Sequence, residues 1–111
     1  MAIIANSEAK NMLHIVLNNG AHDSVGGQPT VGLSIDIAKI ASAMGYKQTH
    51  TVTSKIELTK VLNQIKEASG PILINILVRK GNRPDLGRPT TTPIQNKQAF
   101  MAEILKTTDE A

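Results

Sequence analysis

The sequence predicts an α/β fold in which helices cover both faces of a parallel sheet, which gives three layers (α/β/α). Two observations carry this prediction. Strand-like and helix-like segments alternate three times along the 111 residues. The last strand-like segment, Ile72 to Val78, is a continuous apolar run, which is typical of a parallel strand buried on both faces. We see no internal repeat and no second domain, so the chain is one domain or part of one.

The composition limits the kinds of core and of functional site that this chain can form. Tyr46 and Phe100 are the only aromatic residues, so we expect an aliphatic core. The absence of cysteine excludes disulfides, thiolate metal sites and cysteine nucleophiles. No apolar run reaches the roughly 20 residues of a membrane span and no signal peptide opens the chain, so we expect a cytoplasmic protein with no membrane partner.

In the first part of the chain, the sequence predicts one strand and a long loop. Residues 1–12 have no capping signal, and we interpret them as the end of a helix or as an arm. Leu13 to Leu17 is a short apolar run that Asn18-Asn19-Gly20 ends, which favours a buried strand. Residues 18–32 are rich in Gly and Asn and are too long for a simple connection, so we expect a functional loop.

A helix and a strand follow this loop. Ser34 is the expected N-cap and Gly45 the expected end of the helix. Apolar residues of helical period predict its buried face: Ile35, Ile37, Ala38, Ile40, Ala41 and Met44. The β-branched and polar residues 46–52 predict a short strand that is exposed on one side.

The next helix has the clearest signals in the chain. Ser54 and Glu57 fit a capping box, in which each side chain satisfies a backbone donor. Gly70-Pro71 is the expected end. The predicted buried face consists of Ile56, Val61, Leu62 and Ile65.

The last part of the chain predicts an irregular arm and a final helix. Residues 79–93 hold three of the five prolines and form the arm, and residues 94–106 form the helix. Although the net charge is only +3, four cationic residues lie within ten positions: Arg79, Lys80, Arg83 and Arg88. The arm has no aromatic residue for base stacking, so nucleic acid is not an expected partner.

Ligands of open α/β sheets bind outside the carboxyl ends of the strands. The Gly-rich loop and the cationic segment both leave such ends, so we expect them along one edge of the sheet. Backbone amides of a Gly-rich loop can approach an oxygen-rich ligand, and the cations favour an anion. The pattern predicts a site for a phosphorylated or carboxylated ligand.

Within the loop, Asn18 and Asn19 offer amide oxygens of the kind that Mg²⁺ prefers. Asn also favours turns, and from the residues alone the turn is the preferred interpretation. His22 is a candidate general acid or base. A triad of His22, Asp23 and Ser24 is disfavoured, because triad partners are brought together by the fold rather than by adjacency. Dinucleotide and P-loop motifs do not occur in the sequence.

Two segments carry a resemblance to a known family. Leu17 to Thr30 (LNNGAHDSVGGQPT) and Leu86 to Pro93 (LGRPTTTP) closely resemble the phosphonopyruvate decarboxylases, a thiamine diphosphate-dependent family. Residues 36–46 are similar to the helix that follows the cofactor loop in thiamine diphosphate enzymes generally. The resemblance covers nearly the whole chain and implies a partial thiamine diphosphate-binding fold.

The resemblance also implies site residues. In the family, an Asp of a Gly-Asp-Gly motif, the second Asn of an Asn-Asn pair and a nearby carbonyl hold Mg²⁺, which holds the diphosphate. Here Asn19 would give its side-chain oxygen and Ala21 its backbone carbonyl. The expected cofactor contacts are Asn18, Asn19, Gly20, Ala21 and Gln28. His22 and Ser24 are the expected catalytic residues, and Arg88 is expected to meet the phosphonate of the substrate.

Gly-Asp-Gly is absent from these 111 residues. The resemblance therefore implies the carboxyl-terminal part of a diphosphate-binding domain, whose partners are an upstream segment and a separate pyrimidine-binding domain that supplies a Glu. The parent enzyme would be a homo-oligomer that converts 3-phosphonopyruvate to phosphonoacetaldehyde and CO₂, while this chain alone would be inactive. The alternatives are a sulfopyruvate decarboxylase-type subunit and a non-catalytic binding or assembly module.

Overall fold

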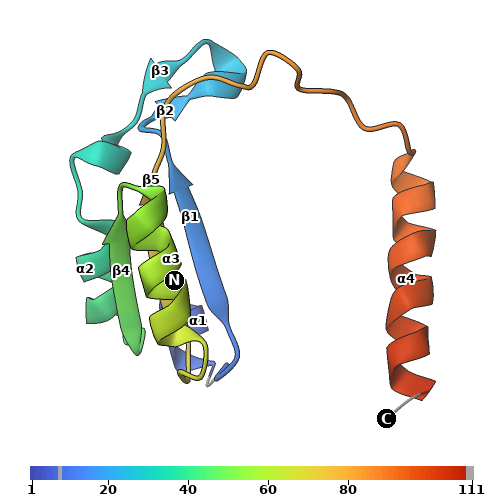
Figure 1. The fold of residues 1–111 in the computed structure, drawn as a ribbon, viewed down its shortest axis with the longest axis horizontal. Helices are drawn as coiled ribbons and strands as arrows, with labels where there is room; N and C mark the ends of the chain where they lie inside the picture. Colours follow the sequence, from blue (N-terminus) through green and yellow to red (C-terminus); the bar gives the residue numbers. More distant parts are fainter. Residues whose placement is uncertain (8, 110–111) are drawn as a thin grey trace. The chain divides into compact units, whose positions relative to one another are not determined.

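The computed structural model describes residues 1–7 and 9–109. The chain divides into two compact units, Met1–Gly81 and Asn82–Ala111. The first unit holds the sheet with its helices, and the second holds the arm and one helix (Figure 1).

The first unit is built on a three-stranded parallel sheet. Its strands are β1 (Leu13–Asn18), β4 (Gln48–Val52) and β5 (Ile72–Leu77), in the order β1-β5-β4. β5 is central because it pairs with both neighbours, which explains why its residues are apolar on both faces. The sequence had predicted these three strands, although β4 begins two residues later than expected.

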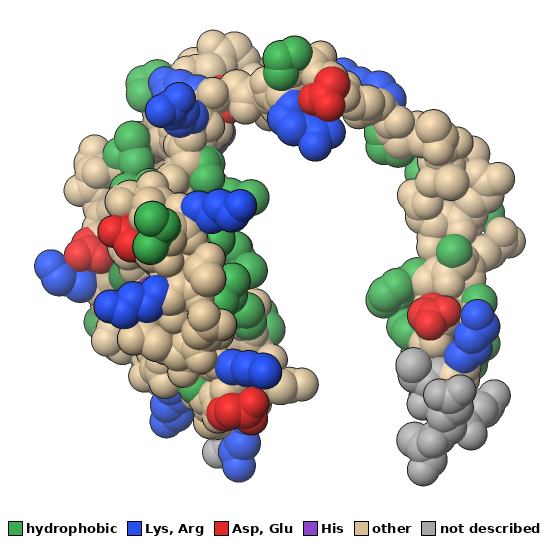
Figure 2. All heavy atoms as spheres, viewed as in Figure 1, with side chains coloured by type: hydrophobic (Ala, Val, Ile, Leu, Met, Phe, Trp, Pro, Cys, Tyr) green, Lys and Arg blue, Asp and Glu red, His purple; other side chains and the backbone are tan. Residues whose placement is uncertain are grey.

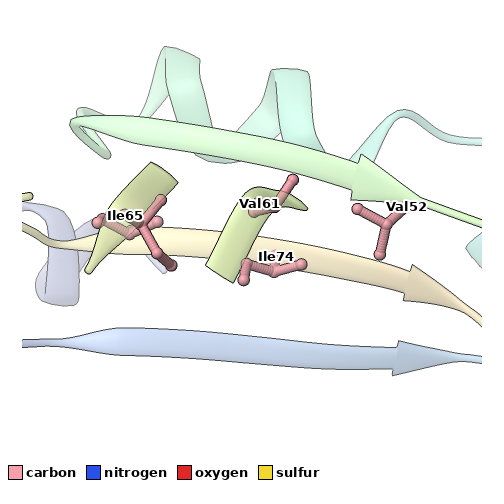
Figure 3. Packing of buried hydrophobic residues seen from close by; sticks show 5 residues of the cluster. Val52, Val61, Ile65 and Ile74 are labelled. Atoms are coloured by element: carbon pink, nitrogen blue, oxygen red, sulfur yellow. The ribbon is translucent and has the colours of Figure 1, made fainter. Parts of the chain in front are cut away.

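Helices cover both faces of the sheet, so the predicted three-layer fold is confirmed. On one face, α1 (Ala2–Asn6) and α2 (Ile37–Ala43) pack around Leu73. On the other face, α3 (Lys55–Ile65) packs against Ile72 and Ile74. Figure 3 shows Val52, Val61, Ile65 and Ile74 of this cluster where α3 lies over β4 and β5. The core is aliphatic, as the composition predicted, with Tyr46 as its one aromatic member among the described residues.

The prediction for the start of α2 was wrong by two residues. The N-cap is Asp36, whose Oδ1 accepts a hydrogen bond of 3.0 Å from the backbone N of Lys39. Ser34 instead ends a short 3₁₀ helix, and Ile35 and Met44 lie outside the helix. Ser and Asp are both good N-caps, so the local sequence did not decide between them.

The capping box of α3 is confirmed at Ser54, whose Oγ accepts a bond of 3.2 Å from the N of Glu57. The reciprocal bond differs from the expectation, because Glu57 accepts from the N of Thr53 (2.7 Å). Ile56 and Leu62 were wrongly assigned to the buried face, since 84% and 41% of these residues are exposed. Leu58 packs beside Val61 and Ile65 instead. The helix ends at Ile65, before Gly70-Pro71.

The second unit contains the arm from Asn82 onward and α4 (Pro93–Asp109). The predicted helix 94–106 is therefore longer at both ends, and Pro93 belongs to the helix because a proline at the first helical position lacks only a donor that is unused there. The described side chains of this unit are exposed as far as residue 106. Among the described helices, none is both long enough and apolar enough to cross a membrane.

Candidate functional site

The Gly-rich loop leaves β1 at the carboxyl edge of the sheet and folds into a small ordered structure. Strands β2 (Ala21–His22) and β3 (Gln28–Pro29) pair antiparallel around a 3₁₀ turn, Asp23–Val25. A second 3₁₀ helix, Val31–Leu33, leads toward α2. The long loop is thus a hairpin seated on the end of β1.

Asn18 anchors this hairpin from inside. Only 7% of the residue is exposed. Its Oδ1 accepts a bond of 3.1 Å from the N of Gly20, and its Nδ2 donates to the carbonyl of Gly32 (2.6 Å). Because both ends of the amide are engaged within the loop, Asn18 joins the beginning of the loop to its end.

Asn19 lies closer to the surface and points its amide along the loop. Its Oδ1 accepts a bond of 3.0 Å from the N of Ala21, and its Nδ2 donates to Oδ2 of Asp23 at 2.7 Å. An amide oxygen has two acceptor positions, so one position of Oδ1 stays open beside this bond. The orientation of Asn19 is therefore defined by a donor at one end and an acceptor at the other.

Gly20 allows the tight turn between Asn19 and the hairpin. Its φ is +66°, a left-handed conformation that glycine adopts without strain. A Cβ at this position would also lie 2.5 Å from Cδ1 of Leu33. Gly20 is thus favoured by its backbone angle, and a Cβ at this position would also displace the exposed side chain of Leu33.

The exits of β1 and β5 meet at this edge. Oδ2 of Asp23 accepts a second hydrogen bond, 2.9 Å from the backbone N of Gly81. Gly81 follows Arg79 and Lys80 directly, so the hairpin contacts the base of the cationic segment. The predicted meeting of the two segments is confirmed at this point.

The structure places the other expected site residues on the same hairpin or on the arm. His22, Ser24 and Gln28 are exposed, and Ala21 is half-buried. Arg88 lies in the second unit and is exposed there. Near it along the arm, Nε of Arg83 pairs with Oδ1 of Asp85 at 3.3 Å.

Sequence reasoning missed Asn75, a polar residue in the middle of β5. Only 4% of it is exposed, and its Oδ1 has no hydrogen-bond partner among the described residues. Asn75 lines a cavity of about 390 Å³ with Thr51, Ser34 and Asp36, at the same edge of the sheet. The available signal was an amide inside an otherwise apolar run, since buried polar groups ordinarily have a partner.

The charged groups of the site are few. The backbone N–H of Lys39 lowers the pKa of Asp36 below its usual value, because it hydrogen-bonds to the ionised carboxylate. No group of three or more His, Asp or Glu side chains gathers as a metal site within the described residues. The oxygens at hand for a hard cation are the amide oxygen of Asn19 and the carbonyl of Ala21, which fit Mg²⁺ in kind and would supply part of its octahedral set.

Comparison with known proteins gives the class of protein to which the chain belongs. Residues 2–76 match the family model of the thiamine pyrophosphate enzymes, C-terminal TPP binding domain, and the chain belongs to this family. The chain is 38% identical over 94 residues to a phosphonopyruvate decarboxylase of Streptomyces viridochromogenes, and 36% identical over 100 residues to one of Streptomyces hygroscopicus. These alignments cover 85% and 90% of the chain.

A sulfopyruvate decarboxylase of Methanosarcina acetivorans is 34% identical over 80 residues, which is 71% of the chain. The chain spans about a quarter of the length of the two Streptomyces relatives (24% and 25%) and 21% of the length of the Methanosarcina one. No solved structure matches the chain.

Proposed function

We propose that the chain is the carboxyl-terminal part of the diphosphate-binding domain of a thiamine diphosphate- and Mg²⁺-dependent 2-oxo acid decarboxylase. The observation that carries this proposal is the placement of Asn19 and Ala21. Both lie just beyond the carboxyl end of β1, where ligands of parallel sheets bind, in a chain of the thiamine pyrophosphate family. Bound thiamine diphosphate supplies the electron sink that 2-oxo acid decarboxylation needs.

The residues of this chain would hold and orient the cofactor. The amide oxygen of Asn19 and the carbonyl of Ala21 are the proposed Mg²⁺ ligands, and the cation would offset the diphosphate charge. Gly20 lets the backbone approach closely, and Asn18 keeps the loop closed from inside. Gln28, His22 and Ser24 stand on the same hairpin and are the proposed contacts to cofactor or substrate.

The proposed substrate is 3-phosphonopyruvate, with phosphonoacetaldehyde and CO₂ as products. Two relatives at 38% and 36% identity carry the name phosphonopyruvate decarboxylase, whereas the one named sulfopyruvate decarboxylase stands at 34% over a shorter stretch. Arg88 is the proposed partner of the phosphonate, because a guanidinium can grip such a group in bidentate fashion.

The proposal extends to the surroundings of β1. On the side of the sheet where α3 packs, residues of β1 in register with Ile72, Ile74 and Ile76 are exposed, including Leu17 at 69%. Figure 2 shows hydrophobic side chains at the surface along β1, beside α3. The outer edge of β1 pairs with no described strand. We propose that an upstream segment of the parent enzyme covers this edge, and that the pyrimidine-binding domain completes the site in a cytoplasmic homo-oligomer.

The test is an assay of the intact protein that contains these residues. With thiamine diphosphate and Mg²⁺, 3-phosphonopyruvate should yield phosphonoacetaldehyde, and sulfopyruvate should react at a lower kcat/KM. A reversed preference would assign the chain to the sulfopyruvate alternative. Absence of aldehyde from both substrates would refute the decarboxylase and favour a non-catalytic module.

A second measurement concerns the 111 residues alone. They hold part of the proposed metal ligands, so we expect no tight binding of thiamine diphosphate and no turnover. Calorimetric titration of the isolated chain with the cofactor and Mg²⁺ checks this. A submicromolar dissociation constant would contradict it.

A further inference from the structure

We infer that Asp23 is a positioning residue that holds the Asn19 amide with its oxygen available to a cation, and that ties this site to the base of the arm at Gly81. The inference rests on the proposed function, in which Asn19 is a Mg²⁺ ligand. Asp23 itself is not proposed as a ligand. It acts through the two hydrogen bonds that one of its carboxylate oxygens accepts.

The first hydrogen bond, from Nδ2 of Asn19 to Oδ2 of Asp23, helps to set the orientation of the Asn19 amide. An asparagine can bind a cation only through Oδ1, because Nδ2 carries two protons and no free lone pair. Here Nδ2 donates to Asp23 at 2.7 Å, while Oδ1 accepts from the N of Ala21 at 3.0 Å. An amide turned by half a revolution would set Nδ2 against the Ala21 N–H and Oδ1 against a carboxylate oxygen. Both contacts would then be repulsive, so Asp23 and Ala21 select the same orientation.

The second bond links two segments that are distant in sequence. Gly81 is 58 positions from Asp23, and its backbone N donates to the same Oδ2 at 2.9 Å. Because β1 and β5 are neighbours, their exits lie side by side, and the carboxylate bridges them. A hydrogen bond to an ionised acceptor is about twice as strong as one between neutral groups. Asp23 therefore restrains the point at which the chain continues into the arm that carries Arg83 and Arg88.

Partners that orient metal ligands typically change metal affinity by about 10- to 100-fold when they are removed. We therefore expect Asp23→Ala to weaken Mg²⁺ binding to the intact protein by that factor. Asp23→Asn keeps an acceptor oxygen of the same shape and should retain most of the affinity. Glu67→Ala, which removes a charge from an exposed residue away from the loop, is the matched control and should leave the affinity unchanged.

The experiment has two arms. The first titrates Mg²⁺ in the presence of thiamine diphosphate, by calorimetry, for the intact wild-type protein and the three variants. The second uses the same proteins without metal or cofactor, and follows by NMR the hydrogen exchange of the Asn19 side-chain amide and of the Gly81 backbone amide. Both amides should be protected in the wild type and in Asp23→Asn, and should lose protection in Asp23→Ala.

The outcomes separate the inference from the proposed function. If Asp23→Asn binds Mg²⁺ as weakly as Asp23→Ala, the charge matters rather than the acceptor, and the positioning role is overturned. It is also overturned if Asp23→Ala binds Mg²⁺ as the wild type does, or if the two amides keep their protection in that variant. A wild-type protein that binds no Mg²⁺ refutes the proposed function, and with it the effect on the metal. The amide exchange then still decides whether Asp23 holds Asn19 and Gly81.

Discussion

His14 and Tyr46 are joined by a hydrogen bond of 2.9 Å between Nδ1 and the phenol oxygen, although 32 positions separate them. His14 stands on β1, and Tyr46 follows α2, so the bond ties the edge strand to the helix layer on that face. Only 5% of Tyr46 is exposed. The pair gives this mainly aliphatic core one directional contact.

Removal of the phenol hydroxyl should destabilise the chain. We expect Tyr46→Phe to lower the free energy of unfolding by about 1–2 kcal/mol, because the half-buried His14 ring nitrogen loses its partner. Urea unfolding of the wild type and the variant measures this. In a double-mutant cycle, Tyr46→Phe should cost clearly less in a His14→Ala background. Equal costs in both backgrounds would mean that the bond contributes nothing.

The same tyrosine predicts a change at alkaline pH. Burial raises the pKa of Tyr46 above its usual value of 10.0, since the phenolate is the form that desolvation disfavours. The unfolded chain deprotonates first, so stability is fully present below about pH 10 and is lost as the pH rises through the folded-state pKa. Because Tyr46 is the only tyrosine, phenolate absorbance reports it alone. The midpoint of the phenolate titration should fall when urea unfolds the chain. An unchanged titration midpoint would contradict the raised pKa of Tyr46.

A methyl group at Gly20 should disturb the loop. The φ of +66° and the 2.5 Å approach to Leu33 Cδ1 both oppose a side chain here. Gly27→Ala is the matched control, since its φ is +72° but nothing lies within 4 Å of the new Cβ. We expect Gly20→Ala to cost about 0.5–1.5 kcal/mol more than Gly27→Ala in chemical denaturation, because the exposed Leu33 side chain must leave its rotamer. If both substitutions cost the same, the contact with Leu33 is not limiting.

Acid should weaken the start of α3. The backbone N–H of Thr53 lowers the pKa of Glu57 below its usual value of 4.5, because it hydrogen-bonds to the carboxylate. The resulting stability is present above the usual value and is lost as the pH falls through the lowered one. Glu57→Gln should reduce the dependence of the urea midpoint on pH as the pH falls below the usual carboxyl pKa of 4.5. Glu67→Gln removes a charge elsewhere and serves as the control; an unchanged pH dependence in Glu57→Gln would refute the role of this bond.

Much of the fold could be predicted because its signals are local. The continuous apolar run of β5 indicated a central parallel strand, and the spacing of Ser54 and Glu57 marked the start of α3. The details that failed have different causes. Ile56 lies five and nine positions before Val61 and Ile65, which places it on another side of the helix. Leu58 lies three and seven positions before them and packs against the core with them. Asp36 and Ser34 are equally good N-caps by residue type, so the path of the chain into α2 decides between them.

The sequence likewise predicted some residues of the candidate site and missed others. The Asn18-Asn19-Gly20 turn at the end of a strand was visible in the residues, and the resemblance gave Asn19 and Ala21 their expected roles. Asn18 and Asn19 have the same side chain, and only the structure separates an inward anchor from a half-buried amide. Asn75 was not predicted as a site residue because its neighbours in the sequence are apolar. The other residues that line its cavity come mostly from other segments of the chain.

By itself, the sequence determined the alternation of strands and helices, the Gly-rich loop at the end of β1 and the family resemblance, because these follow from residues that are close along the chain. The tertiary structure decided which of these residues meet. Asp23 contacts Gly81 across 58 positions only because β5, the last strand along the chain, pairs with β1, the first of this sheet. That pairing depends on burial of apolar side chains from several segments at once, a cooperative property that no single segment contains.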